Sequence, residues 1–204
     1  MIKYFIRTTN ERTLDESFFQ INFEKLIDKD KNTCKFYIEC LKYISDYDAI
    51  LLEDDLILCN NFEKEIEKAV SMYPNKIISF FSVPTLYFET RENKLHGFLQ
   101  CYYFPKGIGK VIAEKLEKLN IKKFKKVVPM LRLLNLDIIE YRPCLVQHLD
   151  NDSLVGNRTG FRRTPYFIDF LKELNIDYKD AEQYKPKLEY LLNQQIKAKI
   201  KSQD

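Results

Sequence analysis

An apolar run that ends in three consecutive acids constrains the fold of this chain more than any other feature. Residues 48–58 read Asp-Ala-Ile-Leu-Leu-Glu-Asp-Asp-Leu-Ile-Leu, which places Glu53, Asp54 and Asp55 between two apolar stretches. A short apolar run with polar flanks is typical of a buried strand. Carboxylates gathered at the end of such a strand repel one another and are poorly solvated, and a divalent cation relieves both problems. The pattern therefore predicts a carboxylate metal site, and the alternative is an acidic turn whose side chains cap the following helix.

The composition fits one compact domain with a sizeable core. The chain has 204 residues, of which 45% are hydrophobic and 14% aromatic, and a single domain commonly takes about 100–200 residues. We expect one domain over residues 1–204, with a core over 1–167 and C-terminal helices packing on it over 168–204. Charged residues are frequent, but the net charge of +3 is small. Composition therefore gives no strong case for nucleic acid or a membrane as an obligatory partner.

Apolar residues recur along the chain with two different periods. Alternating or short continuous apolar runs predict strands, and apolar residues three to four positions apart predict helices. Strands that alternate with helices are typical of an α/β sandwich with a mostly parallel central sheet, which is the predicted fold class. A hairpin-like pair of strands, at residues 86–91 and 97–104, is expected around a turn at residues 92–94. The other expected strands lie at residues 2–6, 21–27, 50–52, 76–83, 136–141 and 143–149, and the expected helices at 33–44, 62–73, 109–119, 127–134, 167–174 and 185–201.

The cysteines indicate a reducing compartment. There are five, an odd number, and none forms a C-x-x-C pair, so buried, reduced thiols are expected and a disulfide framework is not. Residues 1–7 form a short strand-like run with no apolar signal-peptide segment behind it. No stretch approaches the roughly 18 apolar residues that span a bilayer. We therefore expect a cytoplasmic protein without a transmembrane segment, for which peripheral contact with a membrane stays open.

A histidine stands at the end of a second apolar run. His148 closes the strand-like run 143–149, and the polar, glycine-containing stretch 150–163 follows it. A lone histidine is more often a structural residue than a ligand. In an open α/β sheet, however, ligands bind at strand ends near the point where the strand order reverses. Together with the carboxylates, His148 would leave several positions on Mn²⁺ or Mg²⁺ for substrate phosphates.

Three blocks of sequence resemble those of GT-A-fold glycosyltransferases. The acids at 53–55, followed by Asn-Asn-Phe at 60–62, resemble the metal-binding D-x-D region, in the E-D-D form of small bacterial and phage-encoded members. Residues 100–106 are similar to the acceptor-side strand of such enzymes. Residues 143–148, Pro-Cys-Leu-Val-Gln-His, and the Ser-Leu-Val-Gly within 152–157 resemble their C-terminal signature. The resemblance covers most of the chain and implies a GT-A-like (Rossmann-like) α/β/α sandwich.

The resemblance also implies a role for each acid and for the histidine. Asp55 and His148 would bind the metal, Mn²⁺ or Mg²⁺. Glu53 or Asp54 would contact the ribose or the sugar of a nucleotide-diphosphate sugar, most often a UDP-sugar in this class, with Asp54 and Asp55 as the catalytic residues. The metal would act as a Lewis acid that stabilises the leaving nucleotide. The positions that would bind the donor are Arg7, Thr8, Arg12, Asp28, Glu53, Ser153, Asn157, Arg158, Arg162 and Arg163.

Two features of this pattern leave alternatives open. For the arginines after residue 157, the alternative to phosphate binding is a solvated basic loop. Many inverting relatives also carry an aspartate on the helix after the central hairpin, as the base that deprotonates the acceptor, whereas residues 123–130 contain no acid. Either the base comes from elsewhere or the reaction retains configuration, so the sequence assigns no base.

The acceptors of the resembling enzymes are surface glycans, protein side chains and, for phage enzymes, modified DNA bases. The basic run at residues 122–126 would suit a nucleic-acid acceptor, although such runs are commonly solvated helix ends. Two other functions stay open. One is a metal-dependent nuclease or phosphotransferase that uses the three acids, and the other is a non-catalytic binding protein that keeps the fold. The retained acids and His148 argue against the non-catalytic reading.

Overall fold

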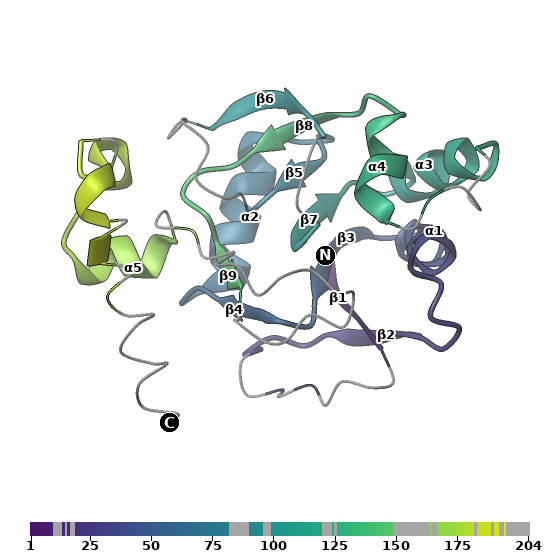
Figure 1. The fold of residues 1–204 in the computed structure, drawn as a ribbon, viewed down its shortest axis with the longest axis horizontal. Helices are drawn as coiled ribbons and strands as arrows, with labels where there is room; N and C mark the ends of the chain where they lie inside the picture. The colour runs from purple at the N-terminus through teal and green to yellow at the C-terminus, as the bar shows by residue number, and fades with distance from the viewer. Residues whose placement is uncertain are drawn as a thin grey trace.

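A seven-stranded sheet forms the middle of the molecule. The computed structural model describes residues 1–9, 14, 16, 19–81, 90–95, 99–119, 124, 126–148, 164, 167–181, 183–188, 190, 191 and 194. The strands of this sheet are β1 (Ile2–Thr9), β2 (Glu24–Asp28), β3 (Asp48–Glu53), β5 (Ile78–Ser79), β6 (Arg91–Lys94), β7 (Cys101–Phe104) and β8 (Asp137–Glu140). They lie in the order β2-β1-β3-β7-β5-β8-β6, with β2 at the bottom of Figure 1 and β6 at the top.

The sheet is mixed in direction. Strand β1 is parallel to both of its neighbours, β2 and β3, and β5 is parallel to β8. Strand β7 lies antiparallel between β3 and β5, and β6 lies antiparallel to β8 at the edge. Five of these strands therefore share one direction and two oppose them. The predicted α/β class is confirmed, with a sheet that is mixed.

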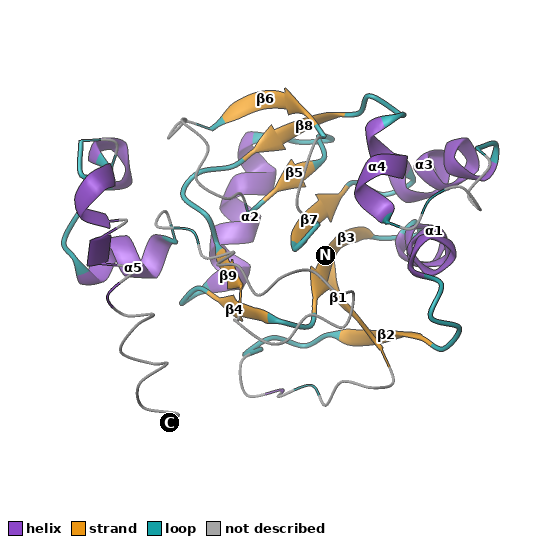
Figure 2. Cartoon of the chain, viewed as in Figure 1, coloured by secondary structure: helices purple, strands orange, loops and turns teal. Residues whose placement is uncertain are grey.

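Helices cover both faces of the sheet (Figures 1 and 2). One face carries α1 (Thr33–Ile44), α3 (Ile108–Glu117) and α4 (Val127–Arg132), whose apolar residues share a single core cluster. The other face carries α2 (Phe62–Met72), α5 (Ile168–Glu173) and a small two-stranded sheet of β4 (Leu56–Leu58) and β9 (Val146–His148). A 3₁₀ turn, η3 (Tyr178–Asp180), follows α5. No helix in the part of the chain listed above is both long and apolar enough to cross a bilayer.

The apolar run before the acids becomes the central strand β3 because both of its faces are covered. Successive side chains of a strand point to opposite faces. Accordingly, Ile50 and Leu52 belong to the cluster beneath α2, while Leu51 belongs to the cluster beneath α1, and none of the three is more than 2% exposed. A strand buried on both faces is continuously apolar rather than alternating. The predicted buried strand at 50–52 is thus confirmed.

The predicted hairpin is wrong. The residues expected to form its turn, 92–94, lie inside strand β6, which pairs with β8, whereas β7 pairs with β3 and β5. The sequence Arg-Glu-Asn-Lys reads as a turn because it is polar, but charged residues are also common on edge strands. Here two of them form cross-strand ion pairs with β8: Arg91 Nε lies 3.2 Å from Glu140 Oε2, and Lys94 Nζ lies 2.6 Å from Asp137 Oδ1.

The other elements occur where they were predicted, with shifted ends. The second strand begins three residues late, at Glu24, and β5 is confined to Ile78–Ser79, with residues 82 and 83 of the predicted strand outside the described part. The last predicted helix is described at 185–188, 190, 191 and 194. Its Leu188 is fully buried against the cluster beneath α2. At this residue the segment contacts the body of the molecule.

All five cysteines are buried and free, as the sequence predicts for thiols in the core. Burial raises the pKa of Cys40 and of Cys59 to about 12. A thiol with a raised pKa holds less of the reactive thiolate at a given pH. We therefore expect that Ellman's reagent at pH 8 modifies no thiol rapidly in the native protein and all five in denaturant. A rapidly reacting thiol in the native protein would contradict this packing.

Helix α3 crosses α1 at a glycine. A Cβ atom added to Gly109 would lie 2.3 Å from the carbonyl oxygen of Leu41 and 3.5 Å from Cβ of Ser45. The same crossing is held by Ser45, whose Oγ accepts a hydrogen bond of 3.0 Å from the backbone N–H of Lys110. Close approach of the two backbones therefore requires glycine at this position.

Gly109→Ala should destabilise the protein, although alanine normally favours a helix by about 1 kcal/mol over glycine. Overpacking against the Leu41 backbone should lower the free energy of unfolding by about 1–3 kcal/mol. Urea unfolding followed by far-UV circular dichroism measures this change. Val111→Ala, at a half-exposed position two residues along the same helix, is the control and should change stability by less than about 0.5 kcal/mol. Stabilisation by Gly109→Ala would refute the close crossing.

Candidate metal centre

The three acids lie where three parallel strands end at one edge of the sheet. In the register of β1 with its neighbours, Arg7 is opposite Glu53 and Thr9 is opposite Asp28. Strand β2 follows β1 on one side, and the chain then passes through α1 to β3 on the other side, so the strand order reverses at β1. Ligands of open α/β sheets bind outside the carboxyl ends of strands at such a point. The fold therefore places the E-D-D sequence at a position suited to a ligand.

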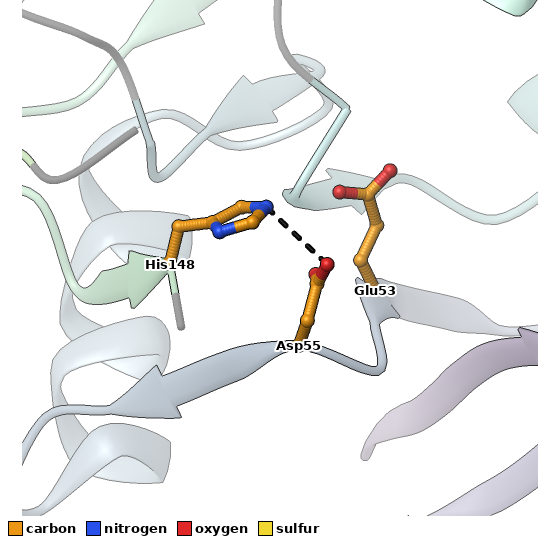
Figure 3. Close-up of side chains that lie close together, drawn as sticks. All are labelled: Glu53, Asp55 and His148. Carbon is orange, nitrogen blue, oxygen red and sulfur yellow. Dashed lines mark ion pairs between the residues drawn. The ribbon is translucent and has the colours of Figure 1, made fainter. Parts of the chain in front are cut away.

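Asp55 and His148 are brought together by the small sheet. Strand β4 begins directly after Asp55, and its first residue, Leu56, is paired with His148 at the end of β9. The His148 imidazole points at the Asp55 carboxylate, with Nε2 3.3 Å from Oδ2 (Figure 3). The two side chains are only 9% and 10% exposed. The pair that the resemblance assigned to the metal is therefore adjacent in space.

Glu53 joins this pair as a third potential ligand. One ligand atom each from Glu53, Asp55 and His148 lies within 4.8 Å of the others, and Figure 3 shows the three side chains converging. Ligands about 2.1 Å from a small divalent cation lie at most about 4.2 Å apart, so small side-chain movements would close the set. Two carboxylates and one imidazole suit Mn²⁺ or Mg²⁺ and leave positions for other oxygen ligands. The donor set fits the predicted cation.

Arg7 is the charge partner of Glu53. Its guanidinium forms an ion pair with Glu53 Oε1, and the two side chains are 11% and 22% exposed. The guanidinium carbon also lies 5.3 Å from the centre of the Tyr37 ring, on the face of the sheet covered by α1. Burial alone would lower the pKa of Arg7, but Glu53 together with Tyr37, Cys40 and Asp55 outweighs it, and the pKa is raised. Arg7 is thus a permanent positive charge beside the metal ligands.

The third acid, Asp54, has a different partner. The Thr8 hydroxyl donates a hydrogen bond to Asp54 Oδ2, and Thr8 is 8% exposed. Because Thr8 follows Arg7 in β1, the two side chains point to opposite faces of the sheet. Arg7 and Thr8, which are adjacent in β1, therefore contact Glu53 and Asp54 on opposite faces of the sheet. Asp54 is not one of the three residues whose ligand atoms cluster.

Asp28 lies at the same edge of the sheet, and its side chain stabilises the turn that follows β2. It is 5% exposed, and its Oδ1 accepts a hydrogen bond of 3.2 Å from the backbone N–H of Asp30. This hydrogen bond ties the carboxylate to the turn that follows β2. Its predicted contact with a nucleotide stays a prediction. The predicted donor-binding residues Arg12, Ser153, Asn157, Arg158, Arg162 and Arg163 lie outside the described residues.

The strand that carries His148 is fixed by its neighbour Gln147. The Gln147 side chain donates from Nε2 to the carbonyl oxygen of Thr164 at 3.1 Å and accepts at Oε1 from the Thr164 N–H at 2.8 Å. Both residues are buried. A side-chain amide that hydrogen-bonds both the N–H and the C=O group of one residue takes the place that the backbone of a neighbouring strand would have. Gln147 therefore attaches Thr164 alongside β9.

Three aspects of this centre were not assigned from the sequence. The acids as a group were predicted to bind a metal, but the resemblance gave Glu53 to the sugar nucleotide, so its place beside Asp55 and His148 was not singled out. Its ion pair with Arg7 was not predicted. The strand β1 is recognisable from the sequence, but the register that sets Arg7 opposite Glu53 is not. The sequence assigned Gln147 no role of its own beyond its place in the block at residues 143–148.

Comparison with protein-family models and with curated protein sequences gives no match for this chain. Any function proposed for this chain therefore rests on its sequence and on the residues of the centre.

Gln147→Leu should destabilise the protein strongly. It leaves the buried N–H and C=O groups of Thr164 without hydrogen bonds, which should lower the free energy of unfolding by about 2–4 kcal/mol. Gln183→Leu, at an exposed position, is the matched control and should change stability by less than about 0.5 kcal/mol. Urea unfolding with far-UV circular dichroism compares the two. Equal effects of the two substitutions would contradict the role given to Gln147.

Proposed function

We propose that the protein is a metal-dependent glycosyltransferase that uses a nucleotide-diphosphate sugar, most often a UDP-sugar in this class. One observation carries the proposal: Glu53, Asp55 and His148 converge at the carboxyl edge of an α/β sheet. They come from two sequence blocks that are far apart in the chain and that the resemblance assigns to one metal site. Their meeting in space supports that assignment, and a GT-A-like fold is part of the proposal.

Each residue of the centre has a role in the proposed reaction. Mn²⁺ or Mg²⁺, held by Asp55 and His148 with Glu53 in reach, would supply Lewis-acid charge to the donor diphosphate. Asp54, oriented by the Thr8 hydroxyl, would accept hydrogen bonds from the sugar or the ribose. Arg7 and Asp28, at the ends of β1 and β2, would border the nucleotide. The low exposure of Asp55 and His148 would limit the access of water to the ligands.

For the acceptor, we propose a chemical class and no single compound. We propose a glycan, a protein side chain or a modified DNA base, in line with the resembling enzymes. Of the basic run at 122–126 that would suit DNA, only residues 124 and 126 are described. We also propose that the enzyme works in the cytoplasm, and the five buried, free thiols support a reducing compartment.

A thermal-shift screen with UDP-, GDP- and CMP-sugars, with and without Mn²⁺, tests the proposal. One nucleotide family should raise the melting temperature by about 5–10 °C at about 100 times its Kd, and only with Mn²⁺ present. Asp55→Asn should abolish this shift, because it removes one negative ligand while keeping the size of the side chain. Asp137→Asn, at an exposed position on β8, makes the same chemical change away from the centre and should keep the shift.

The screen and two activity assays that follow it separate the competing functions. Mn²⁺-dependent release of nucleoside diphosphate from the stabilising donor, lost in Asp55→Asn, would support a transferase. Absence of any shift with every donor would contradict the proposal. Mn²⁺-dependent cleavage of DNA, lost in the same variant, would instead favour a nuclease.

A further inference from the structure

Arg7 is held in place beside Glu53 of the carboxylate cluster. It pairs with Glu53 on one side and packs over the Tyr37 ring on the other, and its side chain is 11% exposed. A guanidinium fixed by packing and by an ion pair loses little further freedom when it binds, so its charge acts at a defined place. Any positive ion that enters the cluster must do so beside this charge.

The cation and Arg7 would draw on the same carboxylate. Glu53 accepts the ion pair from Arg7, and it also offers one of the three ligand atoms that lie within 4.8 Å of one another. Two positive charges that share one carboxylate repel each other, and this repulsion is strong where water is largely excluded. A cation that gains Glu53 as a ligand must therefore weaken the pair between Glu53 and Arg7.

We propose that Arg7 competes with the divalent cation for Glu53 and thereby keeps the affinity of the centre for a free cation low. This inference rests on the metal site of the proposed function and adds a residue that regulates it. Arg7 is a positioning residue in this role, since it acts on the cation through Glu53. When the cation takes Glu53, the guanidinium is released beside the site where an anionic ligand of the cation would lie.

Titration with Mn²⁺, followed by the electron paramagnetic resonance signal of the free ion, measures the effect without any enzyme assay. Arg7→Met keeps the length and the apolar part of the side chain but removes the charge. It should lower the Kd for Mn²⁺ about tenfold or more, because one unit charge is removed within a side-chain length of the ion. Arg91→Met is the matched control: Arg91 also pairs with a glutamate, Glu140, but on β6, and its loss should leave the Kd within about twofold.

Further variants separate competition from a general effect of charge. Arg7→Lys keeps the charge and should leave the Kd close to that of the wild type. In a Glu53→Gln background, Arg7→Met should tighten Mn²⁺ binding less than it does in the wild type, because the shared carboxylate is gone. An equal gain in both backgrounds would overturn the competition. If circular dichroism shows that Arg7→Met is unfolded, Arg7→Gln takes its place in the Mn²⁺ titration. This variant removes the charge but keeps a hydrogen-bond donor for Glu53.

The failure of this inference can be told from the failure of the proposed function. Mn²⁺ binding to the wild type that is lost in Asp55→Asn, with an unchanged or higher Kd in Arg7→Met, would overturn the role of Arg7 and leave the metal site in place. Absence of Mn²⁺ binding in the wild type, in Arg7→Met and in Arg7→Gln would overturn both.

Discussion

The crowding of negative charge at the end of β3 is the constraint on which the rest of this structure depends. Three adjacent carboxylates at the end of a buried strand are unfavourable unless each has a partner. The chain supplies three partners of different kinds: a guanidinium for Glu53, a hydroxyl for Asp54 and an imidazole for Asp55. Two of these come from β1, so the parallel pairing of β1 with β3 supplies partners for two of the acids.

These partners also determine how the centre relates to folding. Many metal sites leave the chain unfolded without the ion, because the ligands repel one another and have no other contacts. Here Arg7 supplies positive charge beside Glu53, and β4 and β9 are joined as an antiparallel pair. The three acids thus have partners within the fold itself, and ligands held by such contacts lose less conformational entropy on binding than ligands that must be gathered.

The sequence was most informative where burial and periodicity agree. The apolar run 49–52 is typical of a buried strand and the acids follow it directly, so both were predictable. Strand β6 was not, because its polar residues resemble a turn and become a strand only by pairing with β8. A metal site shared by the acids and His148 was expected from their positions at strand ends and from the resemblance, but the pairing of two short, distant strands that brings Asp55 to His148 was not. Register, which decides that Arg7 faces Glu53, is a property of the assembled sheet.

The candidate ligands belong to two different sheets. Glu53 ends a strand of the large sheet, whereas Asp55 leads into β4 and His148 ends β9 in the small one. The small sheet is continuous with the C-terminal part of the chain, because the Ile168 N–H donates to the carbonyl oxygen of Cys144 and the Asn60 N–H donates to Asp169. The three candidate ligand groups therefore span both sheets, and their spacing depends on how the small sheet and α5 are seated against the large sheet.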